Sequence, residues 1–551
     1  MAAGSESRLS STLGVFGMAF RNRSLLRVEL AWLAFNCAEW GVWLTLMVYA
    51  YTNGGAAATS LIVIVQLVPC ILVAPYLGAI VDRERAGRVL FLGLLIAGGT
   101  MAGLAAAIAL DAPRVIIFVL APVVNLALSV PRPAQAALLP GIVRTPFELT
   151  AGNVVSTWME NVSVFLAPAL TGVILGIGGP ALATGVLAAV SLAGAFVIVG
   201  IPGSRPMTER VEGVSLTAEV RESVAAVWRV PAARTLVGVI GSQYIAIGAL
   251  DVLYVVLAVT TLGMGESGAG YLNSAFGAGG LIGVAVTATL VARRRLAPAL
   301  VAAMITTALA LGVLGIYPTV FGAFVLLMVA GLGTTVFGVT GRVLLQRAAP
   351  PSVLGQVFAL LESLMCIGLV FGAIFVPLLV GISGAEAALI GTALLSLAFL
   401  ALAWRRLRTI DDEADVPQVQ IQLLRLIPMF APLPAPELEG LARALEPVHF
   451  AAGTTVIREG EAGDRFYAIA AGELRVTKNG HDVSTLGRGD GFGEIALIED
   501  VPRTATVTAV SDAELFSLTK EPFILALTGH APAARAAGDM VSRRLGELEE
   551  L

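Results

Sequence analysis

Charged residues are scarce in this chain. Only 13% of its 551 residues are Asp, Glu, Lys or Arg, whereas 57% are hydrophobic and the mean hydropathy is +0.86. Soluble globular proteins carry about 25% charged residues, so most of this chain is expected to lie in lipid. The polar residues are concentrated after about residue 405, and all three histidines follow residue 448. The composition therefore indicates a membrane part and a C-terminal aqueous part.

Cysteine and the common catalytic motifs are also scarce or absent. Cys37, Cys70 and Cys366 lie singly in apolar runs without CxxC or histidine-rich spacing, so neither disulfides nor a metal site are expected. The sequence has no Walker lysine loop, nucleophile elbow or HExxH motif, which disfavours an enzyme and an ATP-driven pump. We therefore expect no catalytic residue and no cofactor. The net charge of −4 also disfavours nucleic-acid binding.

The apolar part contains a series of long hydrophobic runs. A helix needs roughly 20 apolar residues to cross the hydrocarbon core of a membrane. Cutting the sequence at its Gly, Pro, Asp and Arg residues predicts twelve such spans, six on each side of a polar connection. We thus expect an α-helical membrane protein with twelve transmembrane helices in two six-helix halves. The expected spans are 28–51, 56–81, 88–110, 114–139, 147–178, 180–202, 233–262, 267–292, 296–316, 319–345, 352–381 and 384–404.

Basic residues lie at alternate ends of these spans. Arginines precede the first span, form "RRR" (293–295) after the eighth and recur in "WRRLR" (404–408) after the last, whereas Arg114 is the exception near an opposite end. The positive-inside rule then places both termini in the cytoplasm of a multi-pass cell-membrane protein. The expected domains are a cytoplasmic segment (1–27), two transmembrane halves (28–203 and 233–404), a cytoplasmic connection (204–232), a linker (405–420) and the C-terminal domain (421–551).

The loop "GAIVDRERAGRVL" (78–90) connects the second and third expected spans. Together with the six-plus-six arrangement, it resembles the major facilitator superfamily of transporters, and its late Gly87 resembles the drug-exporter-like branches. The resemblance implies a charged latch at the inner face, which would open and close during transport. A loop whose positive charge only sets the topology is the alternative. The residues that match the loop signature are Gly78, Asp82, Arg83 and Arg88.

Four carboxylates, Glu39, Glu160, Asp251 and Glu362, lie away from the ends of the expected spans. An ionisable group at the bilayer centre costs roughly 2.5–3.5 kcal/mol, so each is a functional candidate. No histidine precedes His449, so a proton-coupled carrier would use a carboxylate, and Glu39 and Asp251 are the first choices. For Glu160 and Glu362 a structural hydrogen-bonding role is an equal alternative.

Polar and aromatic residues share one face of the first and seventh spans. By the family resemblance both spans line a central cavity. Its aromatic walls and carboxylates would suit an amphipathic or cationic solute. Arg132 and Arg342 lie toward inner span ends, where snorkelling to water is the expected behaviour. The cavity residues in these two spans are Asn36, Glu39, Trp40, Trp43, Gln243, Tyr244, Asp251 and Tyr254.

After residue 420 the periodicity changes to short alternating runs, which predict a small cytosolic β-barrel or jelly roll with flanking helices. Within it lies "GFGEIALIEDVPRTATV" (491–507). A short helix that begins at Gly493 and Glu494 would present backbone N–H groups to an anion. Arg503 would pair with a phosphate, and Glu494 would accept a hydrogen bond from a ribose hydroxyl. A sugar beside a phosphate predicts a nucleotide.

This stretch resembles the phosphate-binding cassette of the cyclic-nucleotide-binding domains in the catabolite activator protein and the cyclic-nucleotide-dependent kinases. The resemblance implies cyclic AMP as the regulatory ligand, with cyclic GMP as the alternative. In the last helix, Met540, Arg543 and Arg544 are candidates for contacts with the base. By the resemblance, the ribose and phosphate contacts are Gly493, Glu494, Ile495, Ala496, Arg503, Thr504 and Ala505.

The sequence therefore predicts a proton-coupled secondary transporter, an exporter of a small solute, whose alternating access is regulated by cytosolic cyclic nucleotide. Two alternatives stay open. The membrane part could be an anchored sensor that no longer transports, or the cyclic nucleotide could itself be the cargo. Membrane lipid, the nucleotide and a small-molecule substrate are the expected partners, and the oligomeric state is not predicted.

Overall fold

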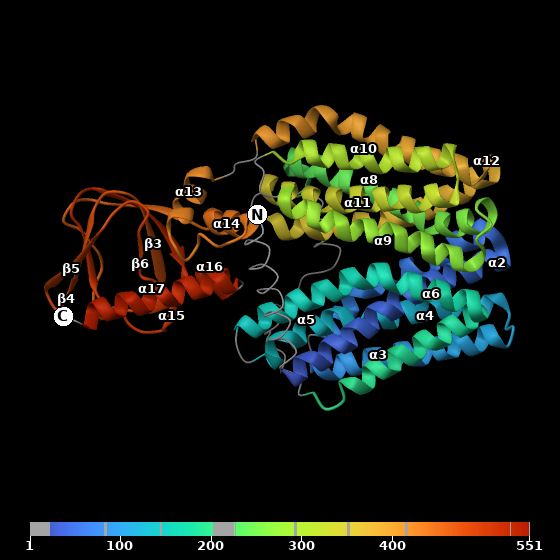
Figure 1. Cartoon of the computed structure of the whole chain (residues 1–551), viewed down its shortest axis with the longest axis horizontal. Helices are drawn as coiled ribbons and strands as arrows, with labels where there is room; N and C mark the ends of the chain where they lie inside the picture. The colour runs from blue at the N-terminus through green and yellow to red at the C-terminus, as the bar shows by residue number, and fades with distance from the viewer. Residues whose placement is uncertain are drawn as a thin grey trace. The chain divides into compact units, whose positions relative to one another are not determined.

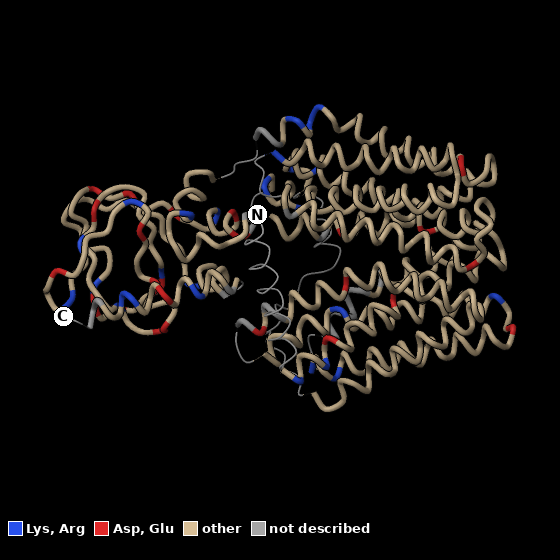
Figure 2. The backbone as a smooth tube through the Cα atoms, in the orientation of Figure 1, with Lys and Arg blue, Asp and Glu red and all other residues tan. Residues whose placement is uncertain are grey.

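The computed structural model describes residues 22–81, 85–143, 146–201, 225, 227–290, 295–349, 353–413, 417–528 and 530–549. The chain forms two compact units, and the second consists of residues 415–551 together with the short segment 145–150 (Figure 1). The first unit is helical, and charged residues are sparse along its helices (Figure 2). The second unit contains all the strands of the described residues and carries charges throughout (Figure 2).

Two of the helices in the first half of the helical unit are interrupted at glycine. Gly55 in α2 and Gly179 in α6 both have φ of 67°, a left-handed value that ends regular α-helix and that glycine adopts without strain. Each of these helices is therefore two helices joined at a kink. The helices of this half are α2 (Arg23–Val81), α3 (Ala86–Ala109), α4 (Arg114–Leu128), α5 (Pro131–Ile142) and α6 (Pro146–Val197).

The second half repeats this pattern. Its last helix is kinked at Gly384, where φ is 85°, and then continues to Glu413, which lies inside the linker (405–420) that the sequence analysis expects. A short π-helical turn follows α8. The elements are α8 (Pro231–Val256), η1 (Leu257–Thr261), α9 (Gly265–Leu290), α10 (Ala297–Ile316), α11 (Val320–Ala348) and α12 (Leu354–Glu413).

Within the described residues, nine helical stretches are long and apolar enough to cross a membrane, judged by length and composition. The helical membrane architecture agrees with the sequence analysis. The count differs from the predicted twelve because three of the stretches, in α2, α6 and α12, run on through a glycine kink. With 59, 52 and 60 residues, each of these three helices is longer than the roughly 20 residues that one crossing needs.

Helices α9 and α11 pack with their backbones almost in contact. A Cβ atom added to Gly279 of α9 would lie 1.8 Å from the carbonyl oxygen of Met328, and one added to Gly331 of α11 would lie 1.9 Å from that of Phe276. Only glycine allows two helices to approach so closely. This contact therefore depends on the two glycines.

The two halves of the helical unit touch along α6 with α9 and along α2 with α12. Ser274 Oγ donates a hydrogen bond to the carbonyl of Phe165 at 2.8 Å, and Ser60 Oγ donates to that of Ala373 at 2.5 Å. A Cβ atom on Gly270 would lie 2.4 Å from the carbonyl oxygen of Pro168. All these residues lie in the helix portions remote from the arginine-rich ends, so the halves are closed together on that side.

The C-terminal unit consists of two four-stranded antiparallel sheets, with strand orders β1-β8-β3-β6 and β2-β7-β4-β5. Alternating burial on β3 and β8 directs their apolar side chains inward, as the sequence pattern predicts. The strands are β1 (Glu446–Phe450), β2 (Thr455–Ile457), β3 (Arg465–Ala471), β4 (Leu474–Lys478), β5 (His481–Leu486), β6 (Gly491–Phe492), β7 (Thr506–Ala509) and β8 (Ala513–Thr519).

As expected, helices precede and follow these strands along the chain, and the short helix α15 lies between β6 and β7. Their core contains Phe430, Phe466 and Phe523, whose ring centroids lie 5.1–5.9 Å apart. Such aromatic clusters stabilise beyond their buried area. The helices are α13 (Gln418–Leu426), α14 (Ala435–Arg443), α15 (Glu494–Ile498), α16 (Lys520–Thr528) and α17 (Ala531–Glu549).

Candidate functional sites

A pocket with about 570 Å³ of empty space, part of it open to solvent, lies in the C-terminal unit. Its apolar wall comes from β2, β4, β5, β6 and β7, and its polar groups come from α15, the segment after it and α17. All seven residues that the sequence analysis singled out in the cassette line this pocket: Gly493, Glu494, Ile495, Ala496, Arg503, Thr504 and Ala505.

Gly493 sets the geometry of the cassette. Its φ of 91° is left-handed, and a Cβ atom there would lie 2.6 Å from Arg503 Nη1 and 2.9 Å from the carbonyl oxygen of Arg465. A side chain would be both strained and obstructed at this position. The glycine therefore allows α15 to begin directly beside the guanidinium of Arg503.

Arg503 is nearly buried, with 4% of its surface exposed. Its guanidinium donates to the carbonyl of Gly493 at 3.1 Å and to that of Arg465 at 2.8 Å. Burial lowers the pKa of the guanidinium, yet arginine stays cationic because its pKa is so high. Gly463 lies beneath it, and a Cβ atom there would lie 3.1 Å from Arg503 Cζ. The site thus holds a rigid cation at its wall.

Glu494 is 1% exposed and is paired with the C-terminal helix. Arg544 of α17 donates to Glu494 Oε1 at 2.6 Å and to the carbonyl of Gly491 at 2.7 Å. Among the residues that the structure describes, Glu494 Oε2 has no hydrogen-bond partner. A buried carboxylate oxygen without a partner is unfavourable, so this atom is poised to accept a donor from a ligand.

Helix α17 covers the cassette. Val541 packs with Ile495 and Ala505 in one buried cluster. Of the three residues proposed to meet a base, Met540 lies in the core of the domain, Arg543 is exposed and Arg544 lines the pocket. Of these three residues, Arg544 is therefore the one that lies at the pocket.

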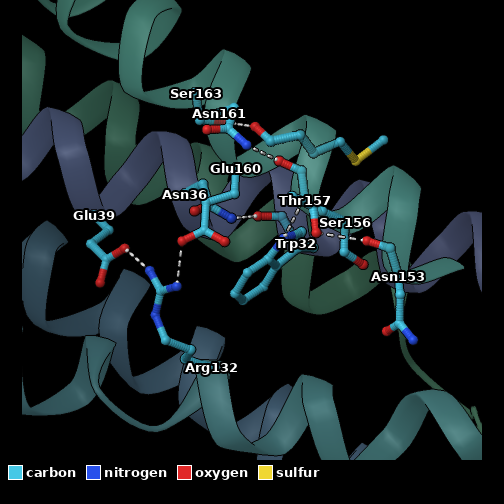
Figure 3. Close-up of polar contacts among 11 residues, drawn as sticks. Trp32, Asn36, Glu39, Arg132, Asn153, Ser156, Thr157, Glu160, Asn161 and Ser163 are labelled. Atoms are coloured by element: carbon cyan, nitrogen blue, oxygen red, sulfur yellow. Dashed lines mark hydrogen bonds and ion pairs between the residues drawn. The ribbon is translucent and has the colours of Figure 1, made fainter. Parts of the chain in front are cut away.

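A cluster of charges lies inside the first half of the helical unit. Figure 3 shows the Arg132 guanidinium of α5 between the carboxylates of Glu39 from α2 and Glu160 from α6. Arg132 Nη2 donates to Glu39 Oε2 at 2.9 Å, and Arg132 Nη1 donates to Glu160 Oε1 at 2.6 Å. The sequence analysis expected this guanidinium to snorkel to water, and the structure adds that it pairs with acids from two other helices. We call these three residues the Arg132 cluster.

The Arg132 cluster faces water rather than lipid. The side chains of Arg132, Glu39 and Glu160 are 44%, 29% and 39% exposed. Exposed charges at mid-span face a water-filled opening, since lipid contact would be too unfavourable. The guanidinium also lies over the rings of Trp32, at 5.4 Å, and Phe35, at 5.8 Å. Such cation–π contacts hold the arginine in place.

The second half has a smaller cluster. Arg342 Nη2 donates to Glu362 Oε1 at 2.9 Å, and Tyr244 lies close to Arg342. Arg342 therefore pairs within the protein, while its side chain stays 38% exposed. One arginine with one carboxylate is balanced, whereas the Arg132 cluster has two carboxylates for one arginine.

The remaining predicted cavity residues lie on α2 and α8. Asp251 of α8 lies close to Trp43 of α2, and Tyr254 is buried beside Asp251. Asn36 and Gln243 are buried too. Three buried polar atoms of these predicted cavity residues have no hydrogen-bond partner among the described residues: Asn36 Oδ1, Trp40 Nε1 and Gln243 Oε1.

The predicted loop latch falls largely outside the described residues. Asp82 and Arg83 are not described, and Gly78 lies at the end of α2 in a stretch whose side-chain environment is not described. Arg88 lies in α3. Within the described ranges, no group of three or more His, Cys, Asp or Glu residues could hold a metal ion.

The sequence analysis missed Glu29, which is fully buried in the helical unit. It lies one residue inside the first expected span (28–51), where a charge normally reaches the membrane surface. Its helical spacing to Trp32, Asn36 and Glu39 was the signal that could have identified it, because these residues follow one side of α2.

The two units define a multi-helix membrane protein that carries a ligand-binding β domain. Residues 236–459 match the family model "Major Facilitator Superfamily", and residues 447–528 match "Cyclic nucleotide-binding domain". The chain therefore contains a region of the Major Facilitator Superfamily and a cyclic nucleotide-binding domain, as the sequence analysis predicts. The matches overlap at 447–459, and the structure assigns this overlap to the β domain because β1 pairs with β8.

Relatives of the β domain carry the name "cAMP-dependent protein kinase regulatory subunit". The protein from Yarrowia lipolytica is 46% identical over 102 residues, which cover 18% of this chain and 27% of the relative. The one from Dictyostelium discoideum is 43% identical over 95 residues, covering 16% and 29%. The chain thus spans about a quarter of the length of the curated relatives it matches.

Among solved structures, the regulatory domain of Toxoplasma gondii PKA with cAMP is 34% identical, over 20% of this chain and 44% of that one, with a TM-score of 0.20. The catabolite activator protein of Thermus thermophilus is 26% identical, over 22% and 60%, with a TM-score of 0.21.

Proposed function

We propose that the protein is a secondary transporter whose alternating-access equilibrium is regulated by cyclic nucleotide bound to the C-terminal unit. The observation that carries the proposal is the pocket in which Arg503 and the unpartnered Oε2 of Glu494 both lie. A cation at one place and a free carboxylate oxygen at another match the phosphate and the ribose hydroxyl of one nucleotide.

Cyclic AMP is the proposed ligand. The curated relatives of the β domain are named as cAMP-dependent, and Glu494, Arg503 and Thr504 all line the pocket. The proposed contacts are those of the sequence analysis. Glu494 accepts from the ribose, Arg503 pairs with the phosphate, and the apolar strands hold the base.

We propose twelve spans for the helical unit, with one crossing on each side of the kinks at Gly55, Gly179 and Gly384. The arginine-rich ends then lie in the cytoplasm of the cell membrane, together with both termini. The halves are in contact on the opposite, outer side through the hydrogen bonds of Ser60 and Ser274. This arrangement is the inward-facing state of an alternating-access carrier.

The charged residues favour proton coupling. Charges in the membrane interior mark substrate or proton pathways, and the Arg132 cluster carries one carboxylate more than its arginine balances. We propose that this surplus is neutralised by a proton in one state and by solute in the other. Exchange of this kind would make the protein a proton-coupled exporter of the drug-exporter-like branch, with the loop around Asp82 as its inner latch.

The connection between the units is short. Helix α12 ends at Glu413 and α13 begins at Gln418, so only residues 414–417 separate them. A short connection transmits movement with little slack. The nucleotide can shift the carrier only by its differential affinity for the two states, typically about 1–3 kcal/mol. We therefore expect modulation of the carrier by cyclic AMP.

The proposal predicts that cyclic AMP changes the distance between the outer ends of the two halves. Spin labels would be attached at Leu110 and Tyr317, which are 81% and 70% exposed, after the three native cysteines are replaced. In the full chain in lipid, cyclic AMP should shift the distance distribution measured by pulsed electron resonance. In the Arg503→Ala variant, cyclic AMP should leave the distance distribution unchanged.

The noncyclic 5′-AMP is the ligand control, because it has the same base and a differently placed phosphate. Identical distributions with and without cyclic AMP in a protein that binds it would contradict regulation and favour an anchored sensor. Accumulation of labelled cyclic AMP inside vesicles would instead make the nucleotide the cargo.

A further inference from the structure

Glu29 lies in a sealed polar layer that the proposed function does not use. Its side chain is fully buried, and Glu29 Oε1 accepts a hydrogen bond from Ser156 Oγ at 2.7 Å. Ser156 Oγ in turn accepts from Gln135 Nε2 at 2.9 Å. Glu29 Oε2 is buried, and none of the described residues is its hydrogen-bond partner. We call Glu29, Gln135 and Ser156 the Glu29 layer.

The layer contains no cation within the described residues. Its members come from α2, α5 and α6, and only Glu29 among them is ionisable. The nearest arginine along α2, Arg27, donates to the carbonyls of Val197 and Val199 instead. An ionised carboxylate in such a place is unfavourable without a paired charge, whereas a neutral carboxyl with a hydrogen bond is stable there. The layer is therefore built for a protonated acid.

The same three helices build the Arg132 cluster, about one turn away on α5 and α6 and ten residues further along α2 at Glu39. Arg132 and Gln135 are three residues apart on α5, and Ser156 and Glu160 are four apart on α6. Residues three and four apart are neighbours on one helix face, about one turn from each other. Each helix thus contributes one residue to the sealed layer and one to the water-facing cluster.

Trp32 links the two layers physically. Its Nε1 donates to the carbonyl of Ser156 at 3.1 Å, while its ring lies under the Arg132 guanidinium at 5.4 Å (Figure 3). Within the described residues, the charged groups nearest to the Glu29 layer along these helices are Arg27 on α2, Arg132 on α5 and Glu160 on α6. Because Arg132 pairs with both Glu160 and Glu39, the Arg132 cluster carries one carboxylate more than its arginine balances, and Glu160 can accept a proton.

We propose that Glu29 is a proton-binding site of the transport cycle that exchanges its proton with the Arg132 cluster through the hydroxyl of Ser156. This inference rests on the proposed function, since it gives the carrier a second proton site. In the structure the Ser156 hydroxyl donates to Glu29 Oε1, so the step begins when this hydroxyl turns its hydrogen toward Glu160. Glu29 then transfers its proton to Ser156 Oγ, and Ser156 transfers its own proton to the Glu160 carboxylate, directly or through one water molecule. Glu29 becomes anionic and Glu160 neutral, and no other reactant is consumed.

The proton on Glu29 is tested by infrared spectroscopy of the full chain in lipid vesicles at neutral pH. The difference between the parent and Glu29→Gln should show the carbonyl band of a protonated carboxyl group in the parent. Only carboxylate bands in that difference would overturn the proposal. This readout needs no cargo and no nucleotide.

The route through Ser156 is tested by transferring the vesicles to D₂O and following the isotope shift of that band. We expect the isotope shift of the band to proceed about tenfold more slowly in Ser156→Ala. This factor corresponds to the loss of roughly one hydrogen bond from the proton-transfer path. Ser156→Thr, which keeps a hydroxyl, should restore the parental rate. Ser163→Ala is the matched control, a fully buried serine on the same helix that donates to Met159.

If Ser156 only stabilised the packing of the layer, removal of its hydroxyl would loosen the layer, and the isotope shift would become faster. An equal or faster shift in Ser156→Ala therefore overturns the route. The spin-label response to cyclic AMP is measured on the same preparations. Loss of that response in the parent would contradict the proposed regulation while leaving the infrared result intact, so the two failures are distinguishable.

Discussion

Replacing Arg503 with alanine is expected to abolish cyclic AMP binding to the full chain. The guanidinium provides the cation at the pocket wall, and no other described arginine except Arg544, which is paired with Glu494, lines the pocket. Hydrogen bonds to charged groups contribute about 1.5–3 kcal/mol each, so a two-bond contact with phosphate accounts for at least about a 100-fold change in affinity. Isothermal titration calorimetry measures this change directly.

The matched variants separate charge from geometry. Arg503→Lys keeps the charge but cannot hold both carbonyls, those of Gly493 and Arg465, so it should also bind weakly. Arg475→Ala removes an exposed arginine from β4, a strand that lines the pocket through Val476, and should bind like the parent. Parental affinity in Arg503→Ala would show that the phosphate is held elsewhere.

Replacing Gly331 with alanine is expected to destroy the packing of α9 against α11. The added Cβ atom would lie 1.9 Å from the carbonyl oxygen of Phe276 and 2.8 Å from its carbonyl carbon. These are backbone atoms, so no side-chain rotation relieves the overlap. Overpacking in a core usually costs about 1–3 kcal/mol, and we expect at least the upper value here. Thermal unfolding and size-exclusion profiles in detergent would report the loss.

Gly338→Ala is the control on the same helix. A Cβ atom at Gly338 would meet nothing within 4 Å. Alanine is the better helix former by about 0.8–1.0 kcal/mol, so this variant should be as stable as the parent or more so. Equal unfolding temperatures for Gly331→Ala and Gly338→Ala would contradict the close approach of the two helices.

The cassette could be predicted from the sequence because its chemistry is local. The segment from Gly493 to Ala505 contains the glycine, the acid and the arginine in one short stretch, and the structure brings them to one pocket. The apolar runs predict the helical membrane unit for the same reason, since length and hydropathy are local properties. The partner of Glu494 could not be predicted, because Arg544 lies 50 residues further along the chain.

The charge clusters of the membrane unit depend on contacts across the fold. Arg132 lies 93 residues from Glu39 and 28 from Glu160, so its pairing follows from how three helices pack. Sequence position alone suggested snorkelling for this arginine and no role for Glu29. The acids at mid-span could be singled out because charge is unfavourable there, but their partners required the structure.

The coupling between the two units is tested most directly by locking the carrier and measuring nucleotide affinity. A Cβ atom on Gly176 would lie 3.3 Å from the Cβ atom of Ser267, close to the separation in a disulfide, so cysteines at these two positions should crosslink α6 to α9. Because coupling is reciprocal, fixing the halves must change the affinity for cyclic AMP, by roughly 5–150-fold for typical coupling energies. Calorimetry on the oxidised and reduced full chain should show a difference in this range. Equal affinities in the two forms would contradict the account.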